Sequence, residues 1–265
     1  TGSRRHALAQ ENLLLRERQA HSKARLANAT KDRFLAIMSH ELKQPLNLIH
    51  VQAELLARRA ETGGLAPVQR AAATIQRAVV SQSRIIDDLL DLSRVRTGKL
   101  RLDLQPVELD ELVRGLAEAA GEEARRKGLV LEVACEAGVR CVCDRVRVEQ
   151  IVSNLLANAM KFTPSGGRVG LTLEVSGGHA QLAVADTGTG IALHALSRIF
   201  ELFSQIDPGG TPGNTGLGIG LTLVRELVKA HGGSVEATSD GTGRGARFTV
   251  RLPLADRVEA ADDAS

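Results

Sequence analysis

Two stretches in the first part of the chain show the spacing of apolar residues that an amphipathic helix requires. The first stretch runs from Phe34 to Leu56, and its apolar residues recur every three or four positions on one stripe, the predicted buried face. This first stripe comprises Met38, Leu42, Leu46, Ile49, Ala53 and Leu56. The second stripe comprises Val68, Ala72, Ile75, Val79, Gln82, Ile86 and Leu89. Thr62-Gly63-Gly64 separates the two stretches, and Pro67 suits the first turn of a helix, so the pattern predicts a helical hairpin.

The predicted hairpin occupies residues 31–97. Two helices alone bury little apolar surface, so we expect the hairpin to pair with a second copy in a homodimeric four-helix bundle. Residues 1–30 are polar and helix-prone, with Leu8, Leu15, Ser22 and Ala29 seven positions apart. This partial heptad fits a coiled-coil lead-in from an upstream sensor domain and a solvated helix equally well. Residues 1–3 resemble a cloning remnant, which favours an excised piece of a longer protein.

A different pattern, in which strands alternate with helices, begins after Thr97-Gly98. It predicts an extended linker over residues 98–106, with a strand at the end of the segment 100–109, and a second domain over residues 107–254. Residues 255–265 are expected to be a frayed tail or the start of a linker. Helices are expected at residues 110–127, 144–162 and 217–230. Strands are expected at residues 129–134, 141–143, 168–175, 181–185, 234–238 and 246–252. Asp144 is placed to cap the middle helix, and the order predicts a mixed sheet with helices on one face, an α/β sandwich.

The amino-acid composition argues against two classes of ligand, nucleic acids and membrane surfaces. Hydrophobic residues make up 43% and charged residues 25%, as in ordinary globular proteins. Aromatic residues make up only 2%, without Trp or Tyr, so a platform for stacking nucleic-acid bases is not expected. The net charge of +3 is scattered, which argues against binding to a membrane surface. No apolar run approaches the roughly 18 to 20 residues that span a bilayer, so we expect this portion in the cytoplasm, whether or not the full-length protein is membrane-anchored.

The cysteines are Cys135, Cys141 and Cys143, an odd number in apolar, strand-like segments. This setting suits reduced thiols in a cytoplasmic fold. A metal site is a weak interpretation of the Cys-x-Cys spacing, because no histidine or further cysteine stands at ligand distance along the sequence.

His40 is the candidate for chemistry on the first helix. It lies about 165° from the mean direction of the apolar stripe, which aims the imidazole at solvent, where a partner can reach it. Pro45 has no N–H to donate to the Glu41 carbonyl, so a bend is expected one turn after the histidine. Taken alone, an exposed histidine on such a helix is most often a solvated surface residue.

Three polar residues on the predicted helix 144–162 form a second candidate. Asn154, Asn158 and Lys161 are spaced by four and three positions, so they share one helix face. Their carboxamide oxygens and ammonium group suit a metal–phosphate group, with oxygen for Mg²⁺ and lysine for the phosphate. Scattered polar residues on a helix surface are the simpler alternative if this face is considered alone.

Two glycine-rich motifs follow. The first is Asp186-Thr187-Gly188-Thr189-Gly190, which places a carboxylate at the end of a predicted strand, where it can accept a hydrogen bond from an adenine amino group. The glycines that follow permit close approach of a ligand. Taken alone, this motif is also a common turn. Gly216-Leu217-Gly218-Ile219-Gly220-Leu221 opens a helix without the Walker lysine, and its N–H groups suit an anionic phosphate. Between the motifs, Phe200 and Phe203 can also be core anchors, and residues 207–215 predict a mobile lid.

In this order, five segments resemble the motifs of the sensor histidine kinases of two-component systems, over the chain from about Lys31 to Leu254. They are residues 39–46 (H box), 154–162 (N box), 186–191 (G1 box), 199–203 (F box) and 216–221 (G2 box). The resemblance implies a dimerisation and histidine-phosphotransfer hairpin followed by an ATP-binding domain of the type shared with gyrase and Hsp90. It implies ATP and Mg²⁺ as cofactors.

The same resemblance implies a role for each residue. His40 is then the phosphoacceptor, Glu41 its hydrogen-bonding activator and Asn158 the Mg²⁺ ligand, while Asp186 reads the adenine. The residues implied to line the phosphate site, pocket and lid are Asn154, Lys161, Gly188, Gly190, Gly216, Gly218 and Gly220, with Phe200 and Phe203 in the F box. Four residues after the histidine, where the family usually has Thr or Asn for dephosphorylating its partner receiver, stands Gln44. The resemblance therefore leaves phosphatase activity open.

The implied function is ATP-dependent autophosphorylation of His40, within a subunit or across the dimer, followed by transfer to an Asp of a response regulator. One alternative is an ATPase of the same fold that forms no phosphohistidine, and His40 next to Glu41 and before Pro45, on a face predicted to be exposed, argues against it. The other is a catalytically silent dimeric scaffold that transmits signals by helix rearrangement. The presence of Asn158 and of both glycine motifs argues against that scaffold.

Overall fold

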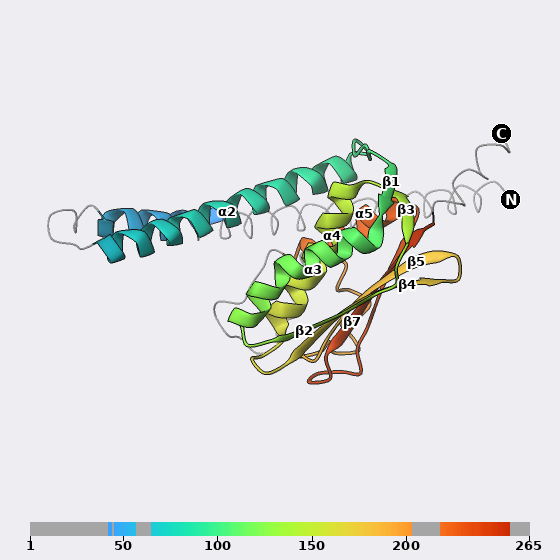
Figure 1. The fold of residues 1–265 in the computed structure, drawn as a ribbon. Coiled ribbons are helices and arrows are strands. Elements are labelled where there is room, and N and C mark those ends of the chain that lie inside the picture. Colours follow the sequence, from blue (N-terminus) through green and yellow to red (C-terminus); the bar gives the residue numbers. More distant parts are fainter. Residues whose placement is uncertain (1–41, 44, 57–64, 203–217, 255–265) are drawn as a thin grey trace, which may run out of the picture. The chain divides into compact units, whose positions relative to one another are not determined.

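The computed structural model describes residues 42–43, 45–56, 65–202 and 218–254 of the chain (Figure 1). The chain divides into two compact units, residues 1–85 and residues 86–265. The predicted lead-in helix, tail and lid lie outside the described residues. Within the described part, no helix is both long enough and apolar enough to cross a membrane.

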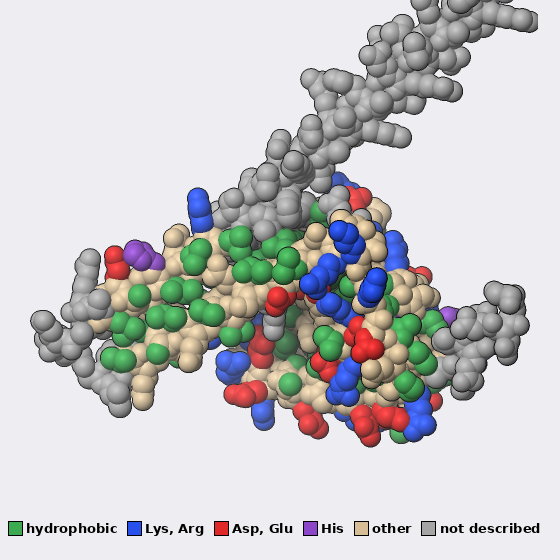
Figure 2. All heavy atoms as spheres, turned by 90° about the horizontal axis from the view of Figure 1, so that it is seen from above, with side chains coloured by type: hydrophobic (Ala, Val, Ile, Leu, Met, Phe, Trp, Pro, Cys, Tyr) green, Lys and Arg blue, Asp and Glu red, His purple; other side chains and the backbone are tan. Residues whose placement is uncertain are grey.

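The first unit contains helical residues 45–56 and the first part of α2 (Leu65–Arg96). On this part of α2 the buried side chains are Ala71 and Ala78, whereas Val79 on the predicted stripe is 47% exposed. Leu46, on the other predicted stripe, is 50% exposed. The stripes expected to be buried are thus largely open in the single chain, because one partner helix covers only one face of another. Hydrophobic side chains gather along this helical hairpin (Figure 2).

The second unit is built on a five-stranded sheet with strand order β2-β4-β5-β7-β6. Its strands are β2 (Val130–Cys135), β4 (Arg168–Ser176), β5 (His179–Asp186), β6 (Ser234–Thr238) and β7 (Ala246–Pro253). β2 runs parallel to β4, and the other neighbours are antiparallel, so the sheet is mixed. A separate antiparallel pair joins β1 (Gln105–Glu108), which begins within the predicted linker, to β3 (Arg140–Cys143).

Three helices cover one face of the five-stranded sheet (Figure 1). They are α3 (Leu109–Arg126), α4 (Arg145–Phe162) and α5 (Gly220–Ala230). This arrangement confirms the predicted α/β sandwich, and its helices and strands lie within a few residues of their expected bounds. The largest difference is at α5, which begins at Gly220 because Gly218 has a φ of +65°, outside the helical region.

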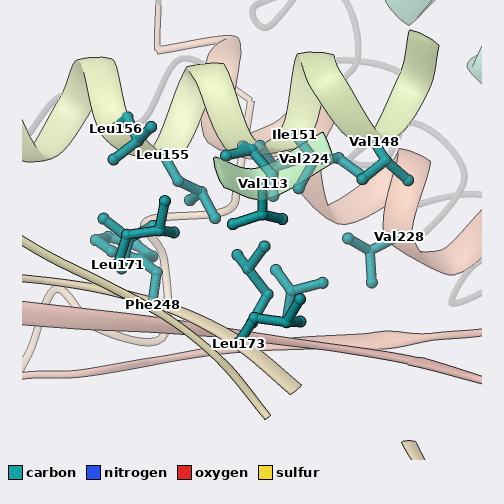
Figure 3. Close-up of a cluster of buried hydrophobic side chains, with 14 of the residues drawn as sticks. Val113, Val148, Ile151, Leu155, Leu156, Leu171, Leu173, Val224, Val228 and Phe248 are labelled. Atoms are coloured by element: carbon teal, nitrogen blue, oxygen red, sulfur yellow. The ribbon is translucent and has the colours of Figure 1, made fainter. Parts of the chain in front are cut away.

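The core lies between the helices and the sheet (Figure 3). Its cluster joins Val113 of α3, Val148, Ile151, Leu155 and Leu156 of α4, Leu171 and Leu173 of β4, Val224 and Val228 of α5, and Phe248 of β7. Ile151 and Leu155 are at most 1% exposed. Burial of side chains of this size contributes about 1.5–3 kcal/mol each, so this packing fixes α4 against the sheet and leaves its opposite face for polar residues.

Asp144 holds three segments together at the start of α4. Its Oδ1 accepts from the Arg147 N–H at 3.1 Å, which confirms the predicted cap. Its Oδ2 accepts from the Asp103 N–H at 3.0 Å, and its own N–H donates to His231 Nε2 at 3.1 Å. His231 Nδ1 lies 2.7 Å from the Leu227 carbonyl oxygen, so the ring proton belongs on Nδ1. The cap therefore joins the segment before β1 to the end of α5.

The last turns of α2, which belong to the second unit, are attached to α4 by charged and polar groups. Asp91 is buried and pairs with the Arg147 guanidinium, whose side chain is 18% exposed. Gln150 Nε2 donates to Asp91 Oδ2 at 3.2 Å and to Asp88 Oδ1 at 3.1 Å. Arg94, more exposed, lies 3.5 Å from Asp91 Oδ1. The buried carboxylate is thus compensated chiefly from α4.

All three cysteines are free thiols, as expected. Cys141 and Cys143 alternate along β3 and are buried. Burial raises the pKa of Cys141 to about 12 and that of Cys143 to about 11. Both thiols therefore stay protonated at neutral pH and serve packing.

Replacing Arg147 with Met should lower the free energy of unfolding by about 2–3 kcal/mol, because among the described residues it leaves the buried Asp91 carboxylate with the exposed Arg94 as its charged partner and the neutral Gln150 amide as its other donor. The matched control is Arg145→Met, which removes a 3.0 Å pair with Glu149 whose two side chains are largely solvated. We expect that control to cost less than about 1 kcal/mol. Urea denaturation of the full chain measures both, and equal losses would contradict the prediction.

Candidate functional site

The polar face of α4 carries the three residues that the sequence singles out on this helix. Asn154, Asn158 and Lys161 are half-buried, while the neighbouring Leu155 and Ala159 are buried in the core. The apolar side of α4 is held by the sheet, so its polar side chains project from a fixed backbone. The Lys161 ammonium lies 5.0 Å from the centre of the Phe162 ring.

Asn154 has an unused hydrogen-bond donor. Its Nδ2 is buried and has no hydrogen-bond partner among the described residues. A Cβ on Gly220 would stand 3.7 Å from Asn154 Oδ1, so the first residue of α5 lies beside this carboxamide. Ile219, the cap residue of α5, makes no side-chain cap hydrogen bond. A buried amide left unpaired costs free energy, and here it stands next to helical N–H groups that favour an anion.

Asp186 is the last residue of β5, and its carboxylate is held by main-chain N–H groups. Oδ1 accepts from the Gly188 N–H at 2.8 Å, and the Ala246 N–H also bonds the carboxylate. Burial raises the pKa of Asp186 above its ordinary value, and these two N–H groups lower it in part. The Asp186 carboxylate is thus a half-buried, oriented hydrogen-bond acceptor at the end of the central strand β5.

The loop after Asp186 needs glycine because other backbone comes very close. At Gly188, a Cβ would collide with the Phe162 carbonyl at the end of α4. The Thr189 N–H donates to that same Phe162 oxygen at 3.1 Å, so the loop is seated on α4. Gly190 has a φ of +65°, and a Cβ there would collide with the Gly241 carbonyl. The structure thus brings Asp186 and its glycines to the end of the helix that carries Lys161.

A second loop, residues 239–245 between β6 and β7, packs on the first, and the sequence analysis does not single it out. The Gly243 N–H donates to the Thr189 oxygen at 2.7 Å, and the Gly245 N–H donates to the Gly188 oxygen at 3.2 Å. Its signal in the sequence is the run Gly241-Thr242-Gly243-Arg244-Gly245 between two predicted strands, which is also typical of an ordinary hairpin loop.

The remaining predicted site residues divide into two groups. Phe200 has the contacts of a core anchor: its ring packs edge-on against Phe248 with centroids 6.3 Å apart, and its carbonyl accepts from the Thr222 hydroxyl at 3.1 Å. Gly218 precedes α5 at its positive φ. The residues that lie outside the described part are His40, Glu41, Gln44, Phe203 and Gly216. Within the described part, no group of three His, Cys, Asp or Glu side chains is arranged to hold a metal ion.

Comparison with known proteins places these features in a family. Residues 143–256 match the family model "Histidine kinase-, DNA gyrase B-, and HSP90-like ATPase", and residues 30–98 match "His Kinase A (phospho-acceptor) domain". The chain is 36% identical over 231 residues to sensor histidine kinase TmoS of Ectopseudomonas mendocina, which covers 87% of this chain and 23% of TmoS. It is 35% identical to sensor protein DivL of Caulobacter vibrioides, over 86% of this chain and 28% of DivL.

Solved structures of histidine kinases resemble this chain in fold. Full-length ShkA in complex with AMPPNP is 33% identical with a TM-score of 0.62, over 83% of this chain and 45% of ShkA. Histidine kinase AdeS of Acinetobacter baumannii, at 22% identity, shares the fold with a TM-score of 0.61, over 82% of this chain and 98% of AdeS.

The chain belongs to the sensor histidine kinases of two-component systems, with a phospho-acceptor domain followed by an ATPase-type domain. It spans about a quarter of the length of the two curated relatives described above.

Replacing Gly188 with Ala should lower the free energy of unfolding by about 1–3 kcal/mol, because the new methyl group collides with the Phe162 carbonyl and displaces the loop. Gly115→Ala is the matched control, since a Cβ at this position in α3 meets no atom within 4 Å. There, better helix propensity should leave stability equal or up to about 1 kcal/mol higher. Thermal melting followed by circular dichroism distinguishes the two, and a Gly188→Ala protein as stable as the control would refute the steric argument.

Proposed function

We propose that the chain is an ATP-dependent protein histidine kinase that phosphorylates His40 and passes the phosphoryl group to an Asp of a response regulator. The observation that carries this proposal is the buried Nδ2 of Asn154, which has no hydrogen-bond partner in the part of the chain that the structure describes. Asn154 stands beside Gly220 at the start of α5 and shares a helix face with Asn158 and Lys161. These groups suit the phosphates of a nucleotide.

An adenine nucleotide with Mg²⁺ fits the residues that the structure describes. Asp186 offers a carboxylate to the adenine amino group, and the close-packed glycines leave backbone rather than side chains around it. Asn158 is the candidate metal ligand through its carbonyl oxygen, while Lys161 and Asn154 are candidates for the phosphate oxygens. The similar protein ShkA was solved with AMPPNP, which supports this assignment of ligand class. When bound, Mg²⁺ would neutralise phosphate charge during the transfer.

The reaction assigned to His40 is an in-line displacement. One imidazole nitrogen forms a bond to the γ-phosphorus, and the bond from that phosphorus to the bridging oxygen breaks, so ADP leaves with the electron pair. Glu41, the next residue, holds the other ring nitrogen in the required tautomer and takes up the proton that the imidazole releases. In the second transfer, an Asp carboxylate oxygen of the response regulator forms a bond to the phosphorus while the bond from phosphorus to the imidazole nitrogen breaks, and a proton returned to the ring regenerates neutral His40.

Incubation with γ-labelled ATP tests the proposal. The wild-type chain should gain acid-labile, base-stable label, and His40→Ala and Asn158→Ala should each lose nearly all of it. His50→Ala is the matched control, because His50 is an exposed histidine in the helical segment 45–56, ten positions after His40 in the sequence and 3.4 Å from Glu54. We expect that control to label like the wild type. Label that persists in His40→Ala refutes the phosphoacceptor, and ATP hydrolysis without any label favours the ATPase alternative.

The open apolar stripe of α2 supports a homodimer, since Val68, Val79, Ile86 and Leu90 are all between 40% and 51% exposed in the single chain. A second copy of the hairpin would cover this stripe in a four-helix bundle. Two-fold symmetry makes each substitution count twice at such an interface.

Sedimentation velocity should show a dimer of the full chain at micromolar concentration. Val79→Asp should weaken the dimer at least tenfold, because it buries two carboxylates per dimer, a cost above about 1.4 kcal/mol. Val146→Asp is the control: Val146 is 64% exposed in the first turn of α4, where a carboxylate is tolerated. A monomeric wild-type chain would sink the dimer proposal.

A further inference from the structure

Ser239, which follows β6, joins the two loops of the site through one hydroxyl. Its Oγ accepts from the Ile191 N–H at 3.0 Å and from the Gly241 N–H at 3.3 Å. The Gly245 carbonyl oxygen lies 2.6 Å away and that of Gly241 3.3 Å away. A hydroxyl has one proton and two lone pairs, so the shorter contact takes the proton and Ser239 donates to Gly245. The hydroxyl is therefore fully used between the two loops.

The Gly245 carbonyl that accepts from Ser239 belongs to the Gly245–Ala246 peptide group, which lies beside Asp186 of the neighbouring strand β5. The same peptide carries the N–H of Ala246, the residue that stands opposite Asp186 in the register of β5 and β7, and this N–H interacts with the Asp186 carboxylate. On its other side Gly245 packs so closely on the Asp186 carbonyl that a Cβ would collide with it. Because a peptide group is planar, fixing its oxygen from one side fixes the direction of its N–H on the other.

We propose that Ser239 is a positioning residue for Asp186, which orients the carboxylate through the Gly245–Ala246 peptide and so helps the site to choose adenine over guanine. The inference rests on the proposed function, in which Asp186 reads the base. Adenine presents an amino donor where guanine presents a carbonyl oxygen, so an oriented carboxylate attracts the first and repels the second. The Ala246 N–H also lowers the pKa of Asp186 against the larger effect of burial, and so favours the ionised carboxylate.

A positioning role differs measurably from a merely structural one. A loop that was only loosened would weaken every nucleotide to a similar extent, since phosphate and ribose contacts would suffer with the base contact. Misorientation of Asp186 instead acts on the base alone. The ratio of ADP to GDP affinity is therefore the informative quantity.

Calorimetric titration of the full chain with ADP and with GDP tests the inference. Ser239→Ala should bind ADP roughly tenfold more weakly, as expected for an impaired hydrogen bond to a charged group, and GDP within twofold of the wild type. Ser239→Thr keeps the hydroxyl and should restore the wild-type ratio. Thr242→Ala, an exposed hydroxyl in the same loop, is the matched control and should leave both affinities unchanged.

Equal weakening of ADP and GDP in Ser239→Ala, or no change in either, would overturn the inference. In an Asp186→Asn background, Ser239→Ala should not alter the ratio further; a further drop would show that Ser239 acts by another route. If the alanine variant melts below the assay temperature, Ser239→Cys, with its weak S–H donor, takes its place under the same criteria. A wild-type chain without preference for ADP would instead refute the proposed function, and the inference with it.

Discussion

The packing of α4 against the sheet is the constraint on which the rest of the second unit depends. Ile151 and Leu155 are buried in the core between α4 and the sheet, which fixes both the rotation of the helix and the face that remains for polar residues. One end of α4 is capped by Asp144 and paired with α2 through Arg147. The other end supports the glycine loop through the Phe162 carbonyl. The helix α4 thus connects the last turns of α2 to the candidate nucleotide site.

Much of the second unit is predictable because its signals are local. Asp144 before an amphipathic stretch, and alternating strands ended by glycines, determine elements without knowledge of distant contacts. The buried face of α2 is different. Ala71 and Ala78 are covered in place of the predicted stripe, and this choice depends on which helix lies alongside, a contact between residues far apart in the chain. A helical period reveals that an apolar face exists but not which partner covers it.

The candidate site likewise contains residues that local sequence patterns predict and residues that only the pairing of distant strands brings together. The shared face of Asn154, Asn158 and Lys161 follows from helical spacing, and the strand end at Asp186 follows from the strand pattern. The loop at residues 239–245 reaches this site only because β7 pairs with β5, so that Ala246 lies opposite Asp186. Its glycines resemble those of any hairpin until that register is known. Phe200 is the reverse situation: the motif 199–203 marks it as a candidate site residue, but in the structure its ring packs against Phe248 of the core.

The raised pKa of Asp186 has a consequence for the stability of the fold. A group whose folded pKa lies above its unfolded pKa contributes stability that is fully present below the unfolded pKa and is lost as the pH rises through the folded pKa. Above the folded pKa, where Asp186 is ionised, folding therefore carries the cost of partly desolvating this carboxylate, and the two N–H groups offset that cost in part. The domain thus holds a partly desolvated charge at the place where it is to meet a donor, so a ligand that donates a hydrogen bond to Asp186 should raise the stability of the folded protein.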